Sequence, residues 1–414
     1  MMDIGYALNA FYPVIGGTET YMLNLINFIS DYHNVHVYTT NATSSFDFRF
    51  IKYSNEVLKV KHQKIGKIDV YRDKVTQLPV LTAKGFVQRF TDSYRSNQET
   101  QNVLTRQATV ILNWGFSLGM CRRLLHDQLD VIHFATLPFL HTYTDSLISW
   151  FRSIPSIFFP CFHRFSDHEA YVNKIPFRFA SKIIALTHEE KREIIRLFKI
   201  PGEKIDVIPS PIEIDEFMID IKADHFPELR ERDGIPKILF IGRLSHNKGF
   251  VFLVETMLDL WKQNIDVDLI FVGTPTEELN TLQPVLHKYP DHVFHYQNIT
   301  QEEKVQLLRL SDVVVLPSIV ESWGRVFLEG WSQKKPVIGA KGMVYEELIK
   351  NDENGFTVPF MDKNALGEKI KLLIGDSKMR KRMGEAGYQL VMDNFTLDKI
   401  LPKFLTIYDE LSRK

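Results

Sequence analysis

The sequence predicts two α/β domains, each built on a parallel, doubly wound sheet. Short apolar runs alternate with amphipathic stretches in both halves of the chain, a pattern typical of parallel strands joined by helices. At 414 residues the chain is too long for one ordinary domain. Between the two series, the prolines of segment 208–212 exclude both a helix interior and a central strand. We therefore predict domains over 1–209 and 210–395, followed by an amphipathic terminal segment over 396–414.

The first domain is predicted to begin with a strand. Segment 3–8 is apolar, contains an acid and lacks the basic leader of a signal peptide. An amphipathic helix follows over 18–30, and runs of strand length then recur along the domain. In order, these strands are 34–40, 130–133, 156–159, 181–186 and 204–208. The pattern is weaker between 46 and 113, where we interpret 67–75 as strands and 86–110 as a polar helix containing aromatic residues.

The second domain shows the same alternation with clearer periodicity. The predicted strands are, in order, 237–241, 268–272, 292–296, 312–316, 336–339 and 355–359. The predicted helices are 249–263, a helix ending at 288, 301–310, 324–334, 363–374, 378–392 and the amphipathic segment 397–411. Two domains of this kind, joined by a proline-rich link, are expected to leave a cleft between their sheet edges in which substrates bind.

Composition narrows the class of protein. Hydrophobic residues make up 44% and charged residues 24% of the chain, as in globular proteins. A net charge of −1 argues against a nucleic-acid-binding protein. The two cysteines, Cys121 and Cys161, form neither a disulfide framework nor a zinc motif, which fits a reducing compartment. No apolar run approaches the roughly 20 residues that span a bilayer. We therefore predict a cytoplasmic protein, with peripheral contact at the inner face of the membrane as an additional hypothesis.

One strand-loop-helix junction has the features of an anion site. The apolar run 312–316 ends at Pro317, and Gly324 opens the next predicted helix, so backbone N–H groups point into the crevice at the carboxyl end of a strand. Glu321 and Glu329 flank this turn, eight positions apart. Carboxylates accept pairs of sugar hydroxyls, so the arrangement suits a diphosphate with a polyol at each end, which describes a nucleotide sugar. Taken alone, the spacing is better explained as a chance pairing on an exposed helix.

With its neighbours, this junction resembles the retaining GT-B glycosyltransferases of family 4, whose C-terminal domains carry two glutamates separated by seven residues. Three further segments are similar to motifs of that family, in the same order along the chain. They are Gly242-Arg243 followed by Lys248-Gly249, the segment ending at Gly273, and the glycine pair Gly16-Gly17. From the glycines alone, a simple tight turn would explain the last pair nearly as well as a ligand-binding loop.

The resemblance implies the GT-B fold, with two Rossmann-like domains facing a cleft. The N-terminal domain would then bind the acceptor, with region 46–113 shaping the acceptor side. The C-terminal domain would bind the nucleotide-sugar donor, and the terminal helix over 396–414 would return to the N-terminal domain. No cofactor and no metal ion are implied, and a nucleotide sugar acts as co-substrate. The triplet 266–268 resembles the carboxylate pair of another glycosyltransferase fold, but it leads straight into a strand, and we give it a structural role.

The resemblance also implies residue roles. Arg243 and Lys248 would grip the diphosphate, although from the residues alone two solvated basic side chains on a surface turn are equally expected. Glu321 would hold hydroxyls of the transferred sugar and Glu329 the ribose diol, and Gly273 would line the base pocket. The other implied donor-binding residues are Gly16, Gly17, Gly242, Ser322, Trp323, Gly324, Arg325 and Val326.

The chain departs from the family pattern at two places. A histidine that members usually have near the transferred sugar is Ala135 here, and the loop after the next strand reads Gly342-Met343-Val344-Tyr345-Glu346 instead of Gly-Gly-x-Pro-Glu. His163 matches another frequent family histidine and is a candidate catalytic residue. As a lone histidine it is equally expected to be structural.

We therefore predict a retaining, metal-independent glycosyltransferase that acts on a glycan, a lipid-linked or a small acceptor. The departures leave a non-catalytic sugar-nucleotide-binding or scaffold subunit as the alternative, with an epimerase or phosphorylase as a weaker one. Aromatic and basic residues over 150–152, 158–165 and 174–179 suggest peripheral contact with a membrane. Such stretches more often consist of buried core residues and a solvent-exposed edge.

Overall fold

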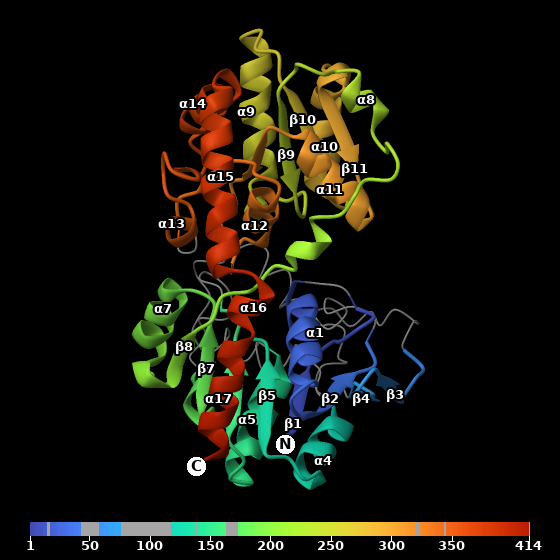
Figure 1. The fold of residues 1–414 in the computed structure, drawn as a ribbon, viewed down its shortest axis with the longest axis vertical. Coiled ribbons are helices and arrows are strands. Elements are labelled where there is room, and N and C mark those ends of the chain that lie inside the picture. Colours follow the sequence, from blue (N-terminus) through green and yellow to red (C-terminus); the bar gives the residue numbers. More distant parts are fainter. Residues whose placement is uncertain are drawn as a thin grey trace, which may run out of the picture. The chain divides into compact units, whose positions relative to one another are not determined.

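The computed structural model describes residues 1–14, 17–42, 58–75, 117–137, 139–162, 173–319, 321, 323–342 and 345–413. Contacts divide the chain into two units, and each is considered by itself (Figure 1). Unit 1 comprises Met1–Ile208 and Leu401–Lys414, and unit 2 comprises Pro209–Ile400. The division falls one residue before the end of the first predicted domain. The helix predicted over 86–110 lies outside the described residues.

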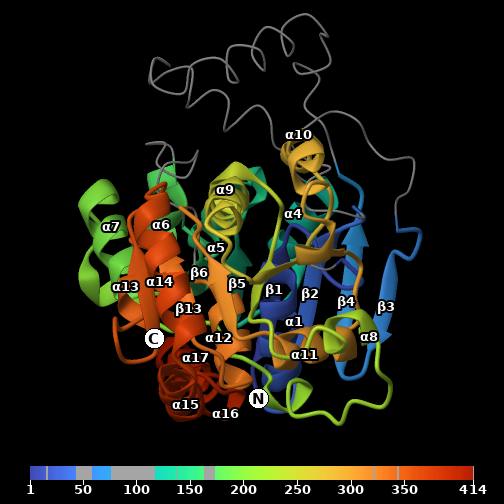
Figure 2. The same ribbon diagram turned by 90° about the horizontal axis from the view of Figure 1, so that it is seen from above.

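Unit 1 is organised on an eight-stranded sheet with the strand order β3-β4-β2-β1-β5-β6-β7-β8. Figure 2 shows β5, β1, β2, β4 and β3 following one another across it. The strands are β1 (Asp3–Leu8), β2 (Asn34–Thr40), β3 (His62–Ile65), β4 (Ile68–Asp73), β5 (Val131–Ala135), β6 (Ser156–Phe159), β7 (Lys182–Ala185) and β8 (Ile205–Val207). All neighbours pair in parallel except β3 and β4, which form a hairpin. The prediction missed β3, because this polar edge strand buries no side chain and gives no apolar signal.

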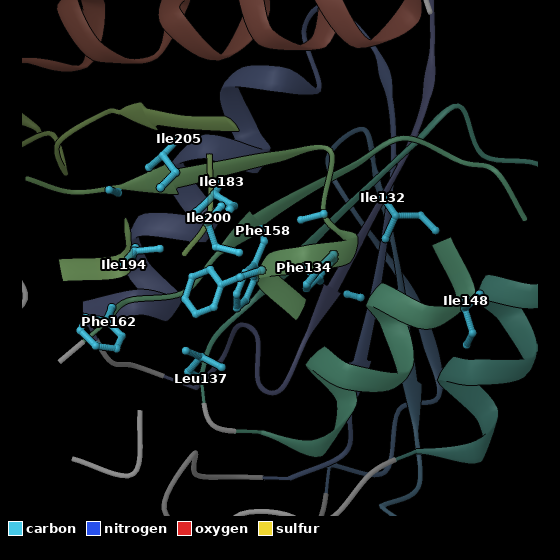
Figure 3. Packing of buried hydrophobic residues seen from close by; sticks show 14 of the residues in the cluster. Ile132, Phe134, Leu137, Ile148, Phe158, Phe162, Ile183, Ile194, Ile200 and Ile205 are labelled. Atoms are coloured by element: carbon cyan, nitrogen blue, oxygen red, sulfur yellow. The ribbon is translucent and has the colours of Figure 1, made fainter. Parts of the chain in front are cut away.

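Helices cover both faces of this sheet. They are α1 (Gly17–Ile29), α4 (Leu118–His126), α5 (Leu140–Phe151), α6 (Lys174–Phe179), α7 (His188–Phe198) and α17 (Pro402–Ser412). One face carries an apolar core between the strands and α4 to α7, shown in Figure 3. In it, the ring of Phe134 stacks on that of Phe158 at 4.9 Å, and Phe158 meets Phe177 edge-on at 5.1 Å. The labelled isoleucines Ile183, Ile194 and Ile205 pack around these rings.

The opposite face of the sheet receives α17, the last helix of the chain. The hydroxyls of Tyr408 on α17 and Tyr6 on β1 are 2.6 Å apart. The Tyr408 hydroxyl also lies 2.9 Å from Nδ1 of His133 on β5. All three side chains are buried, so α17 is joined to unit 1 by a buried polar cluster as well as by apolar packing.

Unit 2 is organised on a six-stranded parallel sheet with the order β11-β10-β9-β12-β13-β14. The strands are β9 (Lys237–Ile241), β10 (Asp268–Val272), β11 (Val293–Tyr296), β12 (Val313–Leu316), β13 (Val337–Ala340) and β14 (Gly355–Val358). The chain runs outward from β9 in one direction and then resumes beside it with β12. This is the strand order of a Rossmann-type sheet, with its switch point between β9 and β12. The prediction of two parallel-sheet α/β domains is therefore confirmed.

The helices of unit 2 pack on both faces of this sheet. They are α8 (Pro227–Arg230), α9 (Phe250–Lys262), α10 (Glu277–Leu286), α11 (Gln301–Leu310), α12 (Arg325–Ser332), α13 (Tyr345–Leu348), α14 (Lys363–Gly375), α15 (Ser377–Asn394) and α16 (Leu397–Ile400). The prediction of one terminal helix over 397–411 is wrong, because Pro402 starts a new helix after α16. Consequently α16 belongs to unit 2 and α17 to unit 1, so only part of segment 396–414 belongs to unit 1.

Candidate active site

The basic loop that follows β9 is fixed by close backbone packing. Gly249 has φ +75°, and a Cβ added to it would lie 2.2 Å from the carbonyl oxygen of Pro317, directly after β12. Only glycine combines this left-handed conformation with so close an approach. The Asn247 carbonyl accepts hydrogen bonds from Ser318 Oγ and from the Ile319 N–H, both at 3.0 Å. The loop after β9 is thus held against the loop after β12, across the switch point of the sheet.

Two predicted site residues meet where these loops touch. Lys248 Nζ donates to a carboxylate oxygen of Glu321 in an ion pair, although the residues are 73 positions apart. The Lys248 side chain is 30% exposed and that of Glu321 16%, so the pair lies at a partly open surface. Behind it, burial and then the Glu321 charge raise the pKa of Tyr345 well above its ordinary value. Arg243 is exposed on the same loop, five residues before Lys248.

Glycine also shapes the turn that begins α12. Gly324 occupies the N-cap of this helix with φ +81°, and its carbonyl accepts the Phe327 N–H at 2.9 Å. The next two N–H groups, those of Arg325 and Val326, belong to the first turn and have no acceptor within the helix. Trp323, which is 6% exposed, packs edge-on against Phe395 at 5.3 Å and supports the turn from behind. Arg325 and Val326 therefore offer main-chain donors at the start of α12.

Glu329 lies one turn further along α12, between two cations. Its carboxylate is 3.2 Å from Lys304 Nζ and 3.5 Å from Arg325 Nε, and its side chain is only 8% exposed. Arg325 also reaches Glu213, with an Nη2 to Oε2 distance of 2.6 Å. Burial lowers the pKa of Arg325, but the carboxylates of Glu213 and Glu329 outweigh this effect and raise it. Glu329 is thus a buried carboxylate held by cations, which excludes the interpretation as an exposed-helix pairing.

Two of these partners, Lys304 and Glu213, were not predicted from the sequence. Glu213 is 112 residues from Arg325 in the chain, and Lys304 is 25 residues from Glu329. Neither separation corresponds to a helical or strand period, so no pattern in the sequence pointed to them. The spacing of four between Arg325 and Glu329 was the one available signal.

The end of β10 contributes the backbone of Gly273. A Cβ at this position would lie 2.1 Å from the carbonyl oxygen of Gly242, so the loops after β9 and β10 touch through their main chains. The Gly242 N–H donates to the Val272 carbonyl at 2.9 Å, and the Gly273 N–H donates to the Tyr296 carbonyl at 3.1 Å. Gly242 and Gly273 thus lie at the same edge of the sheet as Lys248 and Glu321.

The remaining predicted residues belong to unit 1 or lie outside the described residues. Gly16, His163 and Ser322 are in the latter group. Gly17 begins α1, and a Cβ there would meet no atom within 4 Å, so packing does not require a glycine. Ala135, which takes the place of a family histidine, is the buried last residue of β5.

Other predicted features have structural explanations. Asp268 receives Arg232 Nη2 at 2.8 Å and lies 3.1 Å from His292 Nδ1, consistent with the structural role we gave to triplet 266–268. Of the residues described, no group of three or more histidine, cysteine or acidic side chains is placed to hold a metal ion. Within the aromatic stretch 158–165, Phe158, Phe159 and Phe162 are buried and belong to the core, which agrees with the explanation of this stretch as core. No helix in the described ranges has both the length and the apolarity to cross a membrane.

Comparison with known proteins gives matches to two glycosyltransferase family models. Residues 221–390 match the model of glycosyl transferases group 1, and residues 15–216 match that of glycosyltransferase family 4. The alpha-D-kanosaminyltransferase of Streptomyces kanamyceticus is 25% identical over 260 residues, which cover 60% of this chain and 66% of that protein. A D-inositol 3-phosphate glycosyltransferase of Xylanimonas cellulosilytica is 28% identical over 244 residues, covering 56% and 57%. These matches therefore span less than two thirds of each relative.

Among solved structures, Anabaena HepE in complex with UDP and glucose has a similar fold. The TM-score is 0.69 with 18% sequence identity, and the match covers 99% of this chain and 100% of that chain. At this level of identity the similarity concerns the fold.

Proposed function

Because the chain belongs to the group 1 and family 4 glycosyltransferases, we propose that it transfers a sugar from a nucleoside-diphosphate sugar to a glycan, lipid-linked or small acceptor. The proposed transfer retains the anomeric configuration and uses no metal ion. The observation that carries the proposal is the ion pair between Lys248 and Glu321, held at the switch point by the Asn247 contacts. This pair places a cation and a hydroxyl acceptor side by side at the carboxyl edge of the sheet.

The two basic residues would act on the leaving group. Negative charge develops on the diphosphate as the bond to the anomeric carbon breaks, and fixed cations lower that barrier. Lys248 is positioned by its loop and by Glu321, so a diphosphate would take over a cation that is already oriented. Exposed Arg243 would add a second charge from the same loop. In this scheme the cations fill the role that a metal ion has in other transferases.

Glu321 and Glu329 would then hold the two polyol ends of the donor. When the diphosphate engages Lys248, the Glu321 carboxylate becomes available to accept hydroxyls of the transferred sugar. Lys304 and Arg325 hold the Glu329 carboxylate in place, as an acceptor of the ribose diol requires. The first-turn N–H groups of α12 would bind the phosphate oxygens. The UDP and glucose in the HepE complex are consistent with this class of donor.

The acceptor side would be formed by unit 1. There the replacement of a histidine by Ala135 favours the alternative, a sugar-nucleotide-binding subunit without activity of its own.

Exposed Trp150 and Phe151 on α5 support peripheral contact with a membrane, where lipid-linked acceptors lie. With such contact, the protein would act at the cytoplasmic face.

The test combines donor binding with turnover. A panel of nucleotide sugars is screened for an increase in the unfolding temperature, since a bound donor stabilises the folded state according to its affinity. Release of nucleoside diphosphate is then measured with the selected donor and a set of acceptors. We expect Lys248→Ala and Glu321→Ala each to lower turnover by about 10² to 10³. Lys262→Ala, at an exposed position of α9, serves as control.

The outcomes separate the two candidate functions. Diphosphate release that depends on Lys248 and Glu321 supports the transferase. Donor binding without release across the whole acceptor panel would instead support the non-catalytic subunit. Unchanged release in both variants would contradict the assignment of the site.

A further inference from the structure

Buried polar groups of three residues gather at the carboxyl ends of three neighbouring strands in unit 1. Arg72, Thr39 and Asn9 are 3%, 0% and 6% exposed. Of the residues described, these three retain side-chain atoms without any hydrogen-bond partner: Nε and Nη1 of Arg72, Oγ1 of Thr39, and both amide atoms of Asn9. Buried polar side chains normally find partners, so three unsatisfied ones at the ends of neighbouring strands require an explanation.

The strand register brings Arg72 and Thr39 together. Arg72 on β4 and Thr39 on β2 are directly paired, and Thr39 pairs in turn with Leu8 at the end of β1. Side chains of paired residues in parallel strands project from the same face of the sheet. Asn9 follows β1 immediately, and its carbonyl accepts the Thr40 hydroxyl at 2.7 Å. β1, β2 and β4 lie side by side in Figure 2.

The connection from β1 to α1 fixes one end of the arginine. Arg72 Nη2 donates to the carbonyl of Tyr12 in this connection at 2.6 Å. A guanidinium carries five N–H hydrogens, so Nε and Nη1 retain three that no described acceptor uses. The hydroxyl of Thr39, on the same face of the sheet, adds a further donor.

The positive charge of Arg72 is also without a counterion. In the part of the chain that the structure describes, no carboxylate forms an ion pair with it. The adjacent acid, Asp73, lies 3.0 Å from Arg123 Nε instead. Burying a charge without a partner is unfavourable, and burial lowers the pKa of Arg72 as expected from this cost. A cation with spare donors is best satisfied by an anionic oxygen group.

We propose that Arg72, Thr39 and Asn9 bind a phosphate or carboxylate group of the acceptor. The inference rests on the proposed transferase function, in which unit 1 binds the acceptor. It narrows the acceptor class from any glycan, lipid or small molecule to compounds with an anionic group near the reacting hydroxyl. A neutral polyol would use the donors but would leave the charge of Arg72 uncompensated.

The first test measures anion binding without any nucleotide sugar, so it does not depend on turnover. Inorganic phosphate is titrated into the full-length chain, and the unfolding temperature and the heat of binding are recorded. We expect Arg72→Gln to weaken phosphate binding at least tenfold. Lys248→Ala shows whether phosphate is bound at the donor site instead. Arg123→Gln is the matched control, because Arg123 lies close by and already has a partner in Asp73.

Loss of phosphate binding in Arg72→Gln, with binding kept in Lys248→Ala and Arg123→Gln, supports the proposal. Loss only in Lys248→Ala, or an unchanged response in Arg72→Gln, overturns it. If Arg72→Gln does not fold, Thr39→Val removes one donor with little change of shape and should weaken binding severalfold. An unchanged affinity in Thr39→Val would then overturn the proposal.

The second test compares the sources of the anion. Glycerol 3-phosphate represents a small acceptor, and vesicles of phosphatidic acid in phosphatidylcholine represent a lipid one. If Arg72→Gln weakens the binding of either ligand, the result supports the site and shows which source of the anion it selects. If both ligands bind Arg72→Gln as well as they bind the wild type, the proposal is overturned. If phosphate binding depends on Arg72 but no acceptor yields diphosphate release, the transferase function fails while the anion site stands.

Discussion

Gly249 controls how closely the basic loop approaches the carboxyl end of β12. It combines a left-handed conformation with a Cβ position that would clash with the Pro317 carbonyl. The motif Lys248-Gly249 thus joins the cation to the residue that allows its loop to dock. This explains physically why a lysine at this site is followed by glycine.

We expect Gly249→Ala to reduce both stability and donor affinity. The left-handed conformation alone costs a non-glycine residue about 1 to 3 kcal/mol. The clash with Pro317 must in addition displace the loop that carries Lys248. Gly234→Ala is the matched control, because Gly234 has φ +88° but open space around its Cβ position. Chemical denaturation and donor titration should show a stability loss in both variants, with a loss of donor affinity of at least tenfold in Gly249→Ala alone. Equal donor affinity in both would refute this role of Gly249.

At the level of single residues, the sequence located the motif but not its partners. The ion pair of Lys248 with Glu321 joins two residues that were selected as one site from their motifs. Lys304 and Glu213, which hold Glu329 and Arg325, escaped prediction because their contacts arise only from the tertiary fold. Arg72 and Thr39 escaped for the same reason, since only strand register brings them together. Motifs of adjacent residues are visible in a sequence, whereas partners on distant elements are not.

Among the elements, strands that bury most of their side chains were predicted well and polar elements poorly. β1, β2, β6, β9 and β10 have the predicted bounds. In contrast, α5 was missed because its buried face includes polar side chains, which hide the helical periodicity. Several of these bond within their own helix: the hydroxyls of Ser146 and Ser149 donate to the carbonyls of Tyr143 and Ser146 at 2.8 and 3.1 Å. A hydrophobic pattern cannot reveal a helix whose buried face is built in this way.

The C-terminal part of α5 offers an apolar surface to solvent. Trp150 is 61% and Phe151 77% exposed, and Leu147 lies one turn earlier with 42% exposed. The exposed arginines Arg122 on α4 and Arg178 on α6 belong to helices that contact α5. Aromatic side chains flanked by cations are typical of surfaces that insert into the headgroup region of anionic membranes.

We therefore expect the double variant Trp150→Ser/Phe151→Ser to bind anionic vesicles less well. Burying one large aromatic side chain contributes about 1.5 to 3 kcal/mol, so the loss in affinity should be roughly tenfold or more. Cosedimentation with vesicles of phosphatidylglycerol and phosphatidylcholine measures it. Met218→Ser/Leu372→Ser changes two exposed apolar residues of unit 2 as control. Equal sedimentation of both double variants would argue against membrane contact through α5.

For the molecule as a whole, the two-series pattern of strands and helices was sufficient to predict two parallel-sheet units. Each unit has its own sheet, and both sheets change winding direction beside their first strand. Alternation and length carry this information, because a crossover helix is the usual link between parallel strands. The division of the terminal segment was harder to foresee: α16 packs with unit 2 and α17 with unit 1, and the amphipathic pattern runs through both helices.

The buried histidine beneath α17 makes the stability of the protein depend on pH. Burial lowers the pKa of His133 from 6.5 to about 3, so the side chain stays neutral in the folded chain while the unfolded chain takes up a proton below pH 6.5. Stability is then unaffected by this group above pH 6.5 and falls as the pH decreases from 6.5 toward 3. The expected slope is about 1.4 kcal/mol per pH unit for one proton.

Urea denaturation at a series of pH values from about 7 to about 4 measures this slope. His133→Gln cannot titrate in this range. The slope of its unfolding free energy against pH should therefore be smaller than that of the wild type, by the contribution of about one proton. His126→Gln, at an exposed position of α4, is the control. Identical slopes for the wild type and His133→Gln would show that His133 does not titrate on unfolding.

The place of α17 also affects the order in which the chain matures. Tyr6 and His133 cannot form their hydrogen-bond contacts with Tyr408 until that residue is synthesised, which happens only after all of unit 2 has been made. Until then this face of the unit 1 sheet lacks one of its helices, and the side chains of Tyr6 and His133 lack their final partner. The half of the protein synthesised first is therefore the half completed last.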